Sequence, residues 1–248
     1  MPSAPRPGLA PPLRNQLQQS ATSNQQPATS NQPSMLLSLI DSLRCPNAHD
    51  ETWLVASVDE WHGSHVARGV LGCPICRAEY PVIEGVIDFT GGADWPVGVQ
   101  GDESGSSIDH ADVIRLAAQL DLREPGGVVL LAGRYAPLAP WLESIVAAQY
   151  VVVVGVDERI PRGAETGLRV RAQLPLTAQS VRAAAIDGAA ATEVLARETA
   201  RVLRGGGRLV ARASVPLPEG VQELARDEHE WVGAAAGARL APVPLRRR

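Results

Sequence analysis

The sequence predicts an α/β protein in which a parallel sheet follows a small β domain that contains cysteine. From residue 108 onward, apolar runs such as "GVVLLAG" and "YVVVVGVD" alternate with segments that repeat their apolar residues at helical spacing. Continuous apolar runs are typical of parallel strands buried on both faces, and their alternation with helices indicates a parallel sheet. Before residue 97, short extended segments flank two turns that contain cysteine, which favours a separate β domain.

Composition divides the chain of 248 residues into four segments. Residues 1–34 are rich in Pro, Ser, Gln and Asn and contain no acidic residue, so we expect a disordered tail. Residues 35–97 form the β domain, and residues 98–107 lie in the polar, glycine-containing stretch that we predict to be a linker. Residues 108–248 form the α/β domain.

In the β domain, we expect a short helix over residues 36–43 before the first cysteine turn. Strands follow at "TWLVASV" and "HVARGVL", and a further extended stretch, "YPVIEGVIDF", comes after the second cysteine turn.

In the α/β domain, helical spacing predicts helices at "SIDHADVIRLAAQLDL" behind a serine cap, at "PLAPWLESIVAAQ" and at "ATEVLARETARVL". The "RGGG" that follows is expected to stop the last of these helices. The predicted strands are "GVVLLAG", "YVVVVGVD", "LRVRAQLPL", "VRAAAID" and "RLVARASV". A final helix over residues 219–231 and an extended "ARLAPVPL" complete the prediction.

Charge is distributed unevenly along a chain whose formal net charge is -4. Residues 35–150 carry six Arg against sixteen acidic residues, which argues against nucleic-acid binding by this part. Residues 151–248 carry fifteen Arg against eleven acidic residues, which leaves RNA binding as a third hypothesis. No apolar run approaches the roughly 20 residues that span a bilayer, and no signal-like segment begins the chain, so we expect a cytoplasmic protein without membrane contact.

Cysteine spacing predicts a metal site in the β domain. "CPNAH" and "CPIC" together offer three thiols and one imidazole: Cys45, His49, Cys73 and Cys76. Such a set suits tetrahedral zinc, and four protein ligands would make the site structural. His62 and His65 compete with His49 as the fourth ligand, and a metal-free domain with ordinary buried thiols is the other interpretation. A unit this small usually needs a metal or disulfides, which favours zinc.

The pattern "LLSLIDSLRCP…GCPICRAEYPVIEGVIDF" resembles the zinc-ribbon domain of methyltransferase-activating proteins and the N-terminal ribbon of some rRNA guanine methyltransferases. The resemblance covers residues 35–89. It implies a zinc ribbon that contacts a substrate or a protein partner. His49 in the first turn departs from the pattern.

From residue 108 to about residue 245 the chain resembles the Rossmann-like fold of class I S-adenosylmethionine (SAM)-dependent methyltransferases. "EVLARETARVLRGGGRLVARAS" resembles the family's late helix and fifth strand, and "LPLTAQSVRAAAID" resembles the third-strand exit and the fourth strand. "VVVVGVD" resembles the second strand. The resemblance implies that Gly133, Asp157 and Asp187 contact the cofactor, with Asp157 accepting hydrogen bonds from the ribose.

The loop after the first strand departs from the family, in which an acidic residue precedes three alternating glycines. Aligned on Gly133, this chain has Leu131 at the acidic position and Tyr135 and Pro137 at the later glycines. A side chain at these glycine positions would collide with the cofactor. We therefore expect a pseudoenzyme, a non-catalytic scaffold or regulatory subunit. The alternative is an active SAM-dependent methyltransferase with an unknown acceptor.

Overall fold

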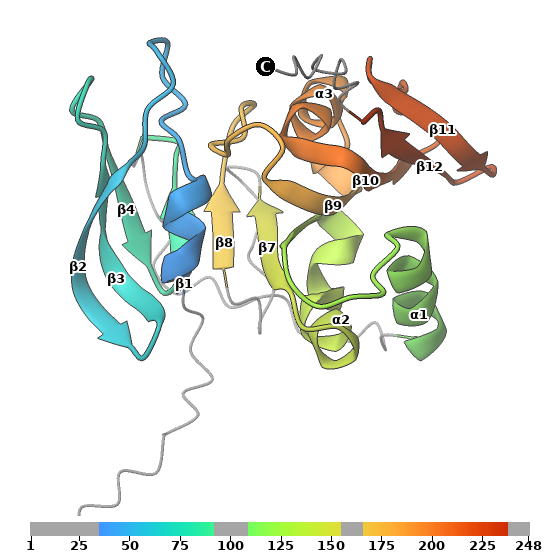
Figure 1. The fold of residues 1–248 in the computed structure, drawn as a ribbon, viewed down its shortest axis with the longest axis horizontal. Coiled ribbons are helices and arrows are strands. Elements are labelled where there is room, and N and C mark those ends of the chain that lie inside the picture. The colour runs from blue at the N-terminus through green and yellow to red at the C-terminus, as the bar shows by residue number, and fades with distance from the viewer. Residues whose placement is uncertain (1–34, 92–108, 155–165, 238–248) are drawn as a thin grey trace, which may run out of the picture. The chain divides into compact units, whose positions relative to one another are not determined.

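The structure, a computed structural model, describes residues 35–91, 109–154 and 166–237. The predicted tail and linker, Asp157 and the terminal "ARLAPVPL" lie outside these residues. The described strands form one 12-stranded sheet in the order β1-β3-β4-β5-β8-β7-β6-β9-β10-β12-β11, with β2 paired to β3 (Figure 1).

The β domain is an antiparallel arrangement that ends in a short hairpin. Its elements are β1 (Met35–Leu36), the 3-10 helix η1 (Leu37–Ser42), β2 (Val55–His62), β3 (His65–Gly72), β4 (Glu79–Ile83) and β5 (Val86–Asp88). The helix predicted over residues 36–43 is thus a 3-10 helix, which follows a two-residue strand.

The α/β domain contains the strands that the apolar runs predicted. Its elements are α1 (His110–Gln119), β6 (Val128–Ala132), η2 (Gly133–Leu138), α2 (Ala139–Ile145), β7 (Gln149–Val154), β8 (Thr166–Arg169), β9 (Val181–Ile186), η3 (Gly188–Ala190), α3 (Glu193–Val202), β10 (Leu203–Arg212), β11 (Val221–Arg226) and β12 (Glu230–Ala235). Among the described helices, none is long and apolar enough to cross a membrane.

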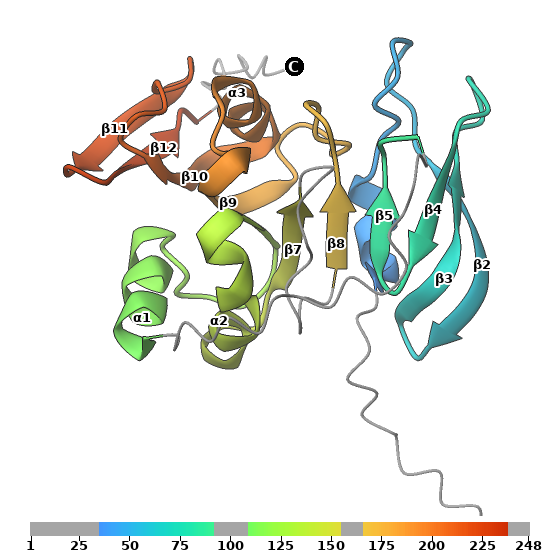
Figure 2. The ribbon, with the colours of Figure 1, turned by 180° about the vertical axis from the view of Figure 1, so that it is seen from behind.

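Parallel pairing joins β8, β7, β6, β9 and β10. In the order of the α/β domain these are its third, second, first, fourth and fifth strands, which is the order of a doubly wound sheet. Alternate residues of these strands point to two separate apolar clusters. One cluster contains α1, α2 and η2, and the other contains α3 and η1, so helices cover both faces (Figures 1 and 2).

The helix predicted over residues 219–231 is wrong, because this segment forms the antiparallel strands β11 and β12. The physical reason is the pairing of β12 with β10, which extends the sheet by a reversed strand. Trp231, fully buried, donates its indole N–H to the carbonyl of Val215 at 2.8 Å, which anchors this hairpin.

Two predicted helix boundaries also differ. The N-cap of α1 is Asp109, whose carboxylate accepts from the N–H of Ala111 at 2.9 Å, so a serine does not cap this helix. The glycines of "RGGG" do not stop α3, because Leu203 is already extended and pairs with Val181 of β9. These glycines lie within β10.

The sheet continues across the expected boundary between the domains, because β5 pairs in parallel with β8. The division near residues 98–107 stays a prediction, since that segment lies outside the described residues. What the structure shows is a β domain and an α/β domain that share one sheet and one apolar cluster.

Candidate functional site

Cysteine and histidine side chains converge in the β domain from two loops. The loop between η1 and β2 and the turn between β3 and β4 supply donor atoms that all lie within 4.8 Å of one another, those of Cys45, His49, Cys73 and Cys76. The Sγ atoms of Cys45 and Cys76 are 3.7 Å apart. Sγ of Cys73 lies 3.4 Å from Nε2 of His49.

These spacings can be compared with the edges of a zinc-centred tetrahedron. Zn–S bonds of about 2.3 Å and a Zn–N bond of about 2.0 Å give edges of about 3.8 Å between sulfurs and about 3.5 Å from sulfur to nitrogen. The imidazole is also oriented suitably, because Nδ1 of His49 lies 2.7 Å from the carbonyl oxygen of Asp50. A proton on Nδ1 leaves the Nε2 lone pair for a metal. The donor set therefore fits tetrahedral zinc.

Polar neighbours of the sulfurs resemble the outer contacts that orient metal ligands. The amide of Asn47 donates to Sγ of Cys76 at 3.3 Å, and the hydroxyl of Tyr80 lies 3.2 Å from Sγ of Cys45. The Asn47 hydrogen bond is the main cause that lowers the pKa of Cys76 to about 6. Burial raises the pKa of Cys45 to about 11.

The two competing histidines lie elsewhere in the β domain. His62 ends β2 and His65 begins β3, and the two pair with each other across the hairpin turn. Neither belongs to the group of converging donors.

The second candidate site lies at the carboxyl ends of β6, β9 and β10, where open parallel sheets bind ligands. The loop after β6 begins at Gly133, which has a φ of +62°. A Cβ at Gly133 would collide with the carbonyl group of Asp187 at the end of β9. This glycine is therefore required by the close approach of two strand ends, whatever else it contacts.

The three positions that depart from the family loop are placed as follows. Leu131 is fully buried in the apolar cluster with α1 and α2. Tyr135 and Pro137 lie in the 3-10 helix η2, and Tyr135 is also buried. The segment after β6 thus coils directly into a helix, with a tyrosine where the family has its second glycine.

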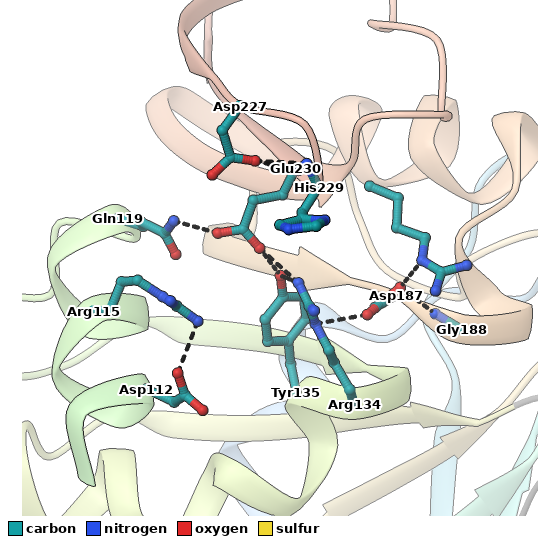
Figure 3. Close-up of polar contacts among 11 residues, drawn as sticks. Asp112, Arg115, Gln119, Arg134, Tyr135, Asp187, Gly188, Asp227, His229 and Glu230 are labelled. Carbon is teal, nitrogen blue, oxygen red and sulfur yellow. Dashed lines mark hydrogen bonds and ion pairs between the residues drawn. The ribbon is translucent and has the colours of Figure 1, made fainter. Parts of the chain in front are cut away.

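Asp187 holds two arginines at the end of β9 (Figure 3). Its Oδ2 lies 2.6 Å from Nε of Arg134, and its Oδ1 lies 2.5 Å from Nε of Arg212. Oδ1 also accepts from the N–H of Gly188 at 2.7 Å. Only 4% of this side chain is exposed, so both carboxylate oxygens are used by the protein itself.

Glu230, at the start of β12, forms the second half of the same network (Figure 3). Its Oε2 accepts from the hydroxyl of Tyr135 at 2.6 Å and from Nη2 of Arg134 at 2.7 Å. Its Oε1 accepts from the amide of Gln119 at 2.5 Å. Burial raises the pKa of Glu230, but these hydrogen bonds and the Arg134 charge outweigh it, so the pKa lies below its ordinary value.

Arg134 therefore bridges two buried carboxylates from β9 and β12. Beside it is a pocket of about 260 Å³, lined by Arg134, Arg212, Ala213, Ser214, Glu228 and His229. Ligand pockets usually measure about 300–1,000 Å³, so this one is small. Its two arginines are already paired to a carboxylate.

The residues found at the end of β6 offer few free polar groups to a cofactor such as SAM. The side of Gly133 that faces β9 is in contact with Asp187, Tyr135 lies in the core, and Leu131 offers no polar atom. The Asp187 carboxylate is occupied by two arginines. Asp157 lies outside the described residues, so its expected contact with a ribose stays a prediction.

Sequence reasoning missed Arg134, Arg212 and Glu230. Glu230 was assigned to a helix, so its position beside β6 could not be foreseen. Neither "VQELAR" nor "EWVGAA" alternates apolar and polar residues, so no period-2 signal indicates this hairpin.

Comparison with known proteins gives methyltransferases among the solved structures. No protein-family model and no curated protein sequence matches the chain. Geranyl diphosphate methyltransferase in complex with SAM is 17% identical over 40% of this chain and 47% of its own, with a TM-score of 0.34. The YcgJ protein of Bacillus subtilis is 21% identical over 42% and 51%, with a TM-score of 0.35.

A third similar structure is the complex between the Haloferax volcanii Trm112 methyltransferase activator and a methyltransferase. A chain of that complex is 13% identical over 50% of this chain and 89% of its own, with a TM-score of 0.40. This chain spans about half the length of the first two structures.

Fold assignment depends on the sheet itself. Parallel strands in the order third, second, first, fourth and fifth, with helices against both faces, form a doubly wound domain. The chain therefore has a doubly wound, Rossmann-like fold.

Proposed function

We propose that this protein is a non-catalytic member of the methyltransferase fold that serves as a scaffold or regulatory subunit. The observation that supports this function is the network of Arg134, Asp187 and Glu230 at the carboxyl end of β6. In this position the protein's own side chains satisfy the polar groups that a cofactor would otherwise contact.

Opening this network would reduce the affinity of a cofactor. Breaking one partner out of a fully buried ion pair costs about 3–5 kcal/mol, which is an upper limit here because the side chain of Arg134 is 50% exposed. A micromolar ligand binds with roughly -8 kcal/mol, so the same contacts would leave only about -3 to -5 kcal/mol after opening. That corresponds to a dissociation constant between about 0.2 mM and several millimolar.

Calorimetric titration of SAM and S-adenosylhomocysteine into the whole chain tests the proposal. We expect no binding in the micromolar range, in a sample whose circular dichroism and cooperative melting show that it is folded. Micromolar binding would contradict the scaffold function and favour an active methyltransferase. The same titration of the Tyr135→Gly variant, which removes the tyrosine side chain from the loop after β6, is the comparison.

A structural zinc ion bound by Cys45, His49, Cys73 and Cys76 is part of the same proposal. Its support is the convergence of the four donors, at sulfur–sulfur and sulfur–nitrogen spacings close to tetrahedral edges. Zinc in such a site supplies folding energy and takes no part in a reaction. The ligands close the coordination shell, so no position remains for a substrate.

Metal analysis of the purified chain tests the zinc site. We expect one zinc per chain, lost in His49→Ala and retained in the matched variant His65→Ala, since His65 lies at a hairpin turn. Loss of zinc in His65→Ala with retention in His49→Ala would overturn this choice of ligand.

A scaffold also requires a protein partner, and we propose that the β domain contacts it. Trp53, Val55 and Trp61 are each more than half exposed, along or next to the edge strand β2. These side chains are the candidate contacts. Protein pull-down compared between the wild type and a Trp61→Ala variant, with Leu224→Ala as the surface control, measures their contribution once a partner is known.

A further inference from the structure

The parallel pairing of β5 with β8 makes the β domain an integral edge of the α/β sheet. Val86, Ile87 and Asp88 pair with Gly167, Leu168 and Arg169. Backbone hydrogen bonds flank this pairing at both ends, from the N–H of Gly167 to the carbonyl of Gly85 at 3.1 Å and from the N–H of Phe89 to the carbonyl of Arg169 at 2.9 Å. The strand edge of β8 is thus occupied by a strand of the same chain.

Gly167 of β8 lies directly against the side chain of Val86 in β5. A Cβ at this position would lie 3.0 Å from Cγ2 of Val86, which is tighter than ordinary packing. The side chain of Val86 therefore packs into the space that the missing side chain of Gly167 leaves.

A second contact involves the segment that leads from β8 to β9. In the described residues 170–180, this connection crosses β7 and β6 without a helix, although such crossovers usually contain one. In this protein the β domain packs against the connection, in the place of a crossover helix. The N–H of Arg44 donates to the carbonyl of Pro175, and the N–H of Thr177 donates to the carbonyl of Ser42, both at 2.9 Å.

Apolar packing reinforces these hydrogen bonds. Leu39 and Leu43, in and directly after η1, are fully buried, and they share one cluster with Leu174 and Leu176 of the crossover. Leu43 and Leu176 also form an antiparallel bridge. The 3-10 helix η1 thus covers the sheet face where a crossover helix would otherwise pack.

The converging cysteines lie immediately next to this contact. Cys45 follows Arg44 in the chain, and its N–H donates to the carbonyl of Thr52 at 3.1 Å, which closes the first cysteine loop. Glu51 in that loop accepts from the hydroxyl of Thr177 at 2.7 Å and pairs with Arg44 at 3.3 Å. One loop therefore connects the metal ligands to the crossover segment.

We infer that the β domain is the internal binding partner of the α/β domain, completing its sheet and covering its helix-free crossover, and that zinc maintains this contact. The zinc part rests on the metal site proposed above. The two expected domains then form one cooperative unit, in which loss of the metal loosens β8 and residues 170–177 as well as the β domain.

Hydrogen–deuterium exchange of the whole chain tests this inference, with zinc bound and after chelation, and with metal content measured on each sample. We expect chelation to raise exchange at least tenfold in peptides from residues 45–52 and 166–177. Peptides from β10 and β12 are the internal control and should change less. Exchange that rises in residues 45–52 but not in residues 166–177, while zinc is lost, would overturn the inference.

A matched pair of substitutions tests the contact without reference to the metal. Leu43→Ala and Leu142→Ala each remove a fully buried leucine, from the β domain and from the opposite face of the sheet respectively. We expect Leu43→Ala to raise exchange in residues 166–177 at least tenfold more than Leu142→Ala does. Equal effects would contradict the contact, whereas absence of zinc from the wild type would contradict the metal site alone.

Discussion

Substitution of Gly133 by alanine separates the structural role of this residue from any cofactor role. Gly133 has a φ of +62°, and a Cβ there would collide with the backbone of Asp187. The left-handed conformation costs an alanine about 1–2 kcal/mol. Forcing extra volume against packed backbone costs about 1–3 kcal/mol more. We therefore expect Gly133→Ala to lower the free energy of unfolding by about 2–5 kcal/mol.

Gly220→Ala is the matched control for this substitution. Gly220 has a φ of +79°, but nothing lies within 4 Å of the Cβ that would be added. The control therefore carries only the conformational cost of about 1–2 kcal/mol. The difference between the two variants isolates the collision between the ends of β6 and β9.

Urea denaturation of the whole chain, followed by circular dichroism, measures both free energies without any ligand. If the two variants differ by less than about 0.5 kcal/mol, the contact between Gly133 and Asp187 is not as described. In that case the side of Gly133 that faces β9 would be open to a cofactor, and the proposed scaffold function would lose this support.

Three further predictions concern the buried network and the cysteine group. Tyr135→Phe removes one of the hydrogen bonds to Glu230, so the free energy of unfolding should fall by about 1–3 kcal/mol; a change below about 0.5 kcal/mol in urea denaturation would contradict this role. Because the folded-state pKa of Glu230 is depressed below 4.5, its stabilising contribution is present above that pH and is lost as the pH falls through the folded pKa. The wild type should therefore lose stability more steeply than Glu230→Gln does as the pH falls below 4.5, and parallel curves would refute the assignment. Cys76→Ser should abolish zinc binding and lower the melting temperature, whereas retention of one zinc per chain would exclude Cys76 as a ligand.

Local pattern was sufficient to predict the central strands and the turn that holds Cys73 and Cys76. The strands β6 and β7 are buried along nearly their whole length, so each appears in the sequence as an apolar run, whereas Arg182 interrupts the equally buried β9. Cys73 and Cys76 belong to one tight turn, so their proximity is a property of four consecutive residues. Both features depend on residues that are close together in the chain, and a single sequence shows such residues directly.

The buried network could not be predicted in the same way, because its members are distant in the chain. Arg134 and Glu230 are 96 residues apart and meet only because β12 reverses direction and pairs with β10. The segment from residue 219 to residue 231 was misassigned as a helix, since several of its residues have good helical propensity. Its actual structure is determined by an open sheet edge and by the burial of Trp231, which are tertiary effects.

The same tertiary effects stabilise the buried carboxylates at the ends of β9 and β12. A carboxylate such as Asp187, with 4% of its side chain exposed, is costly to bury unless charged or polar groups compensate it. In a protein that depends on a ligand, part of that compensation would be absent whenever the ligand is absent. Here Arg134 and Arg212 supply it permanently, and the contacts of Arg134 and Tyr135 with Glu230 tie the β11–β12 hairpin to the loop after β6. The network therefore makes the carboxyl edge of the sheet stable by itself, which suits a protein that presents its surface to a partner continuously.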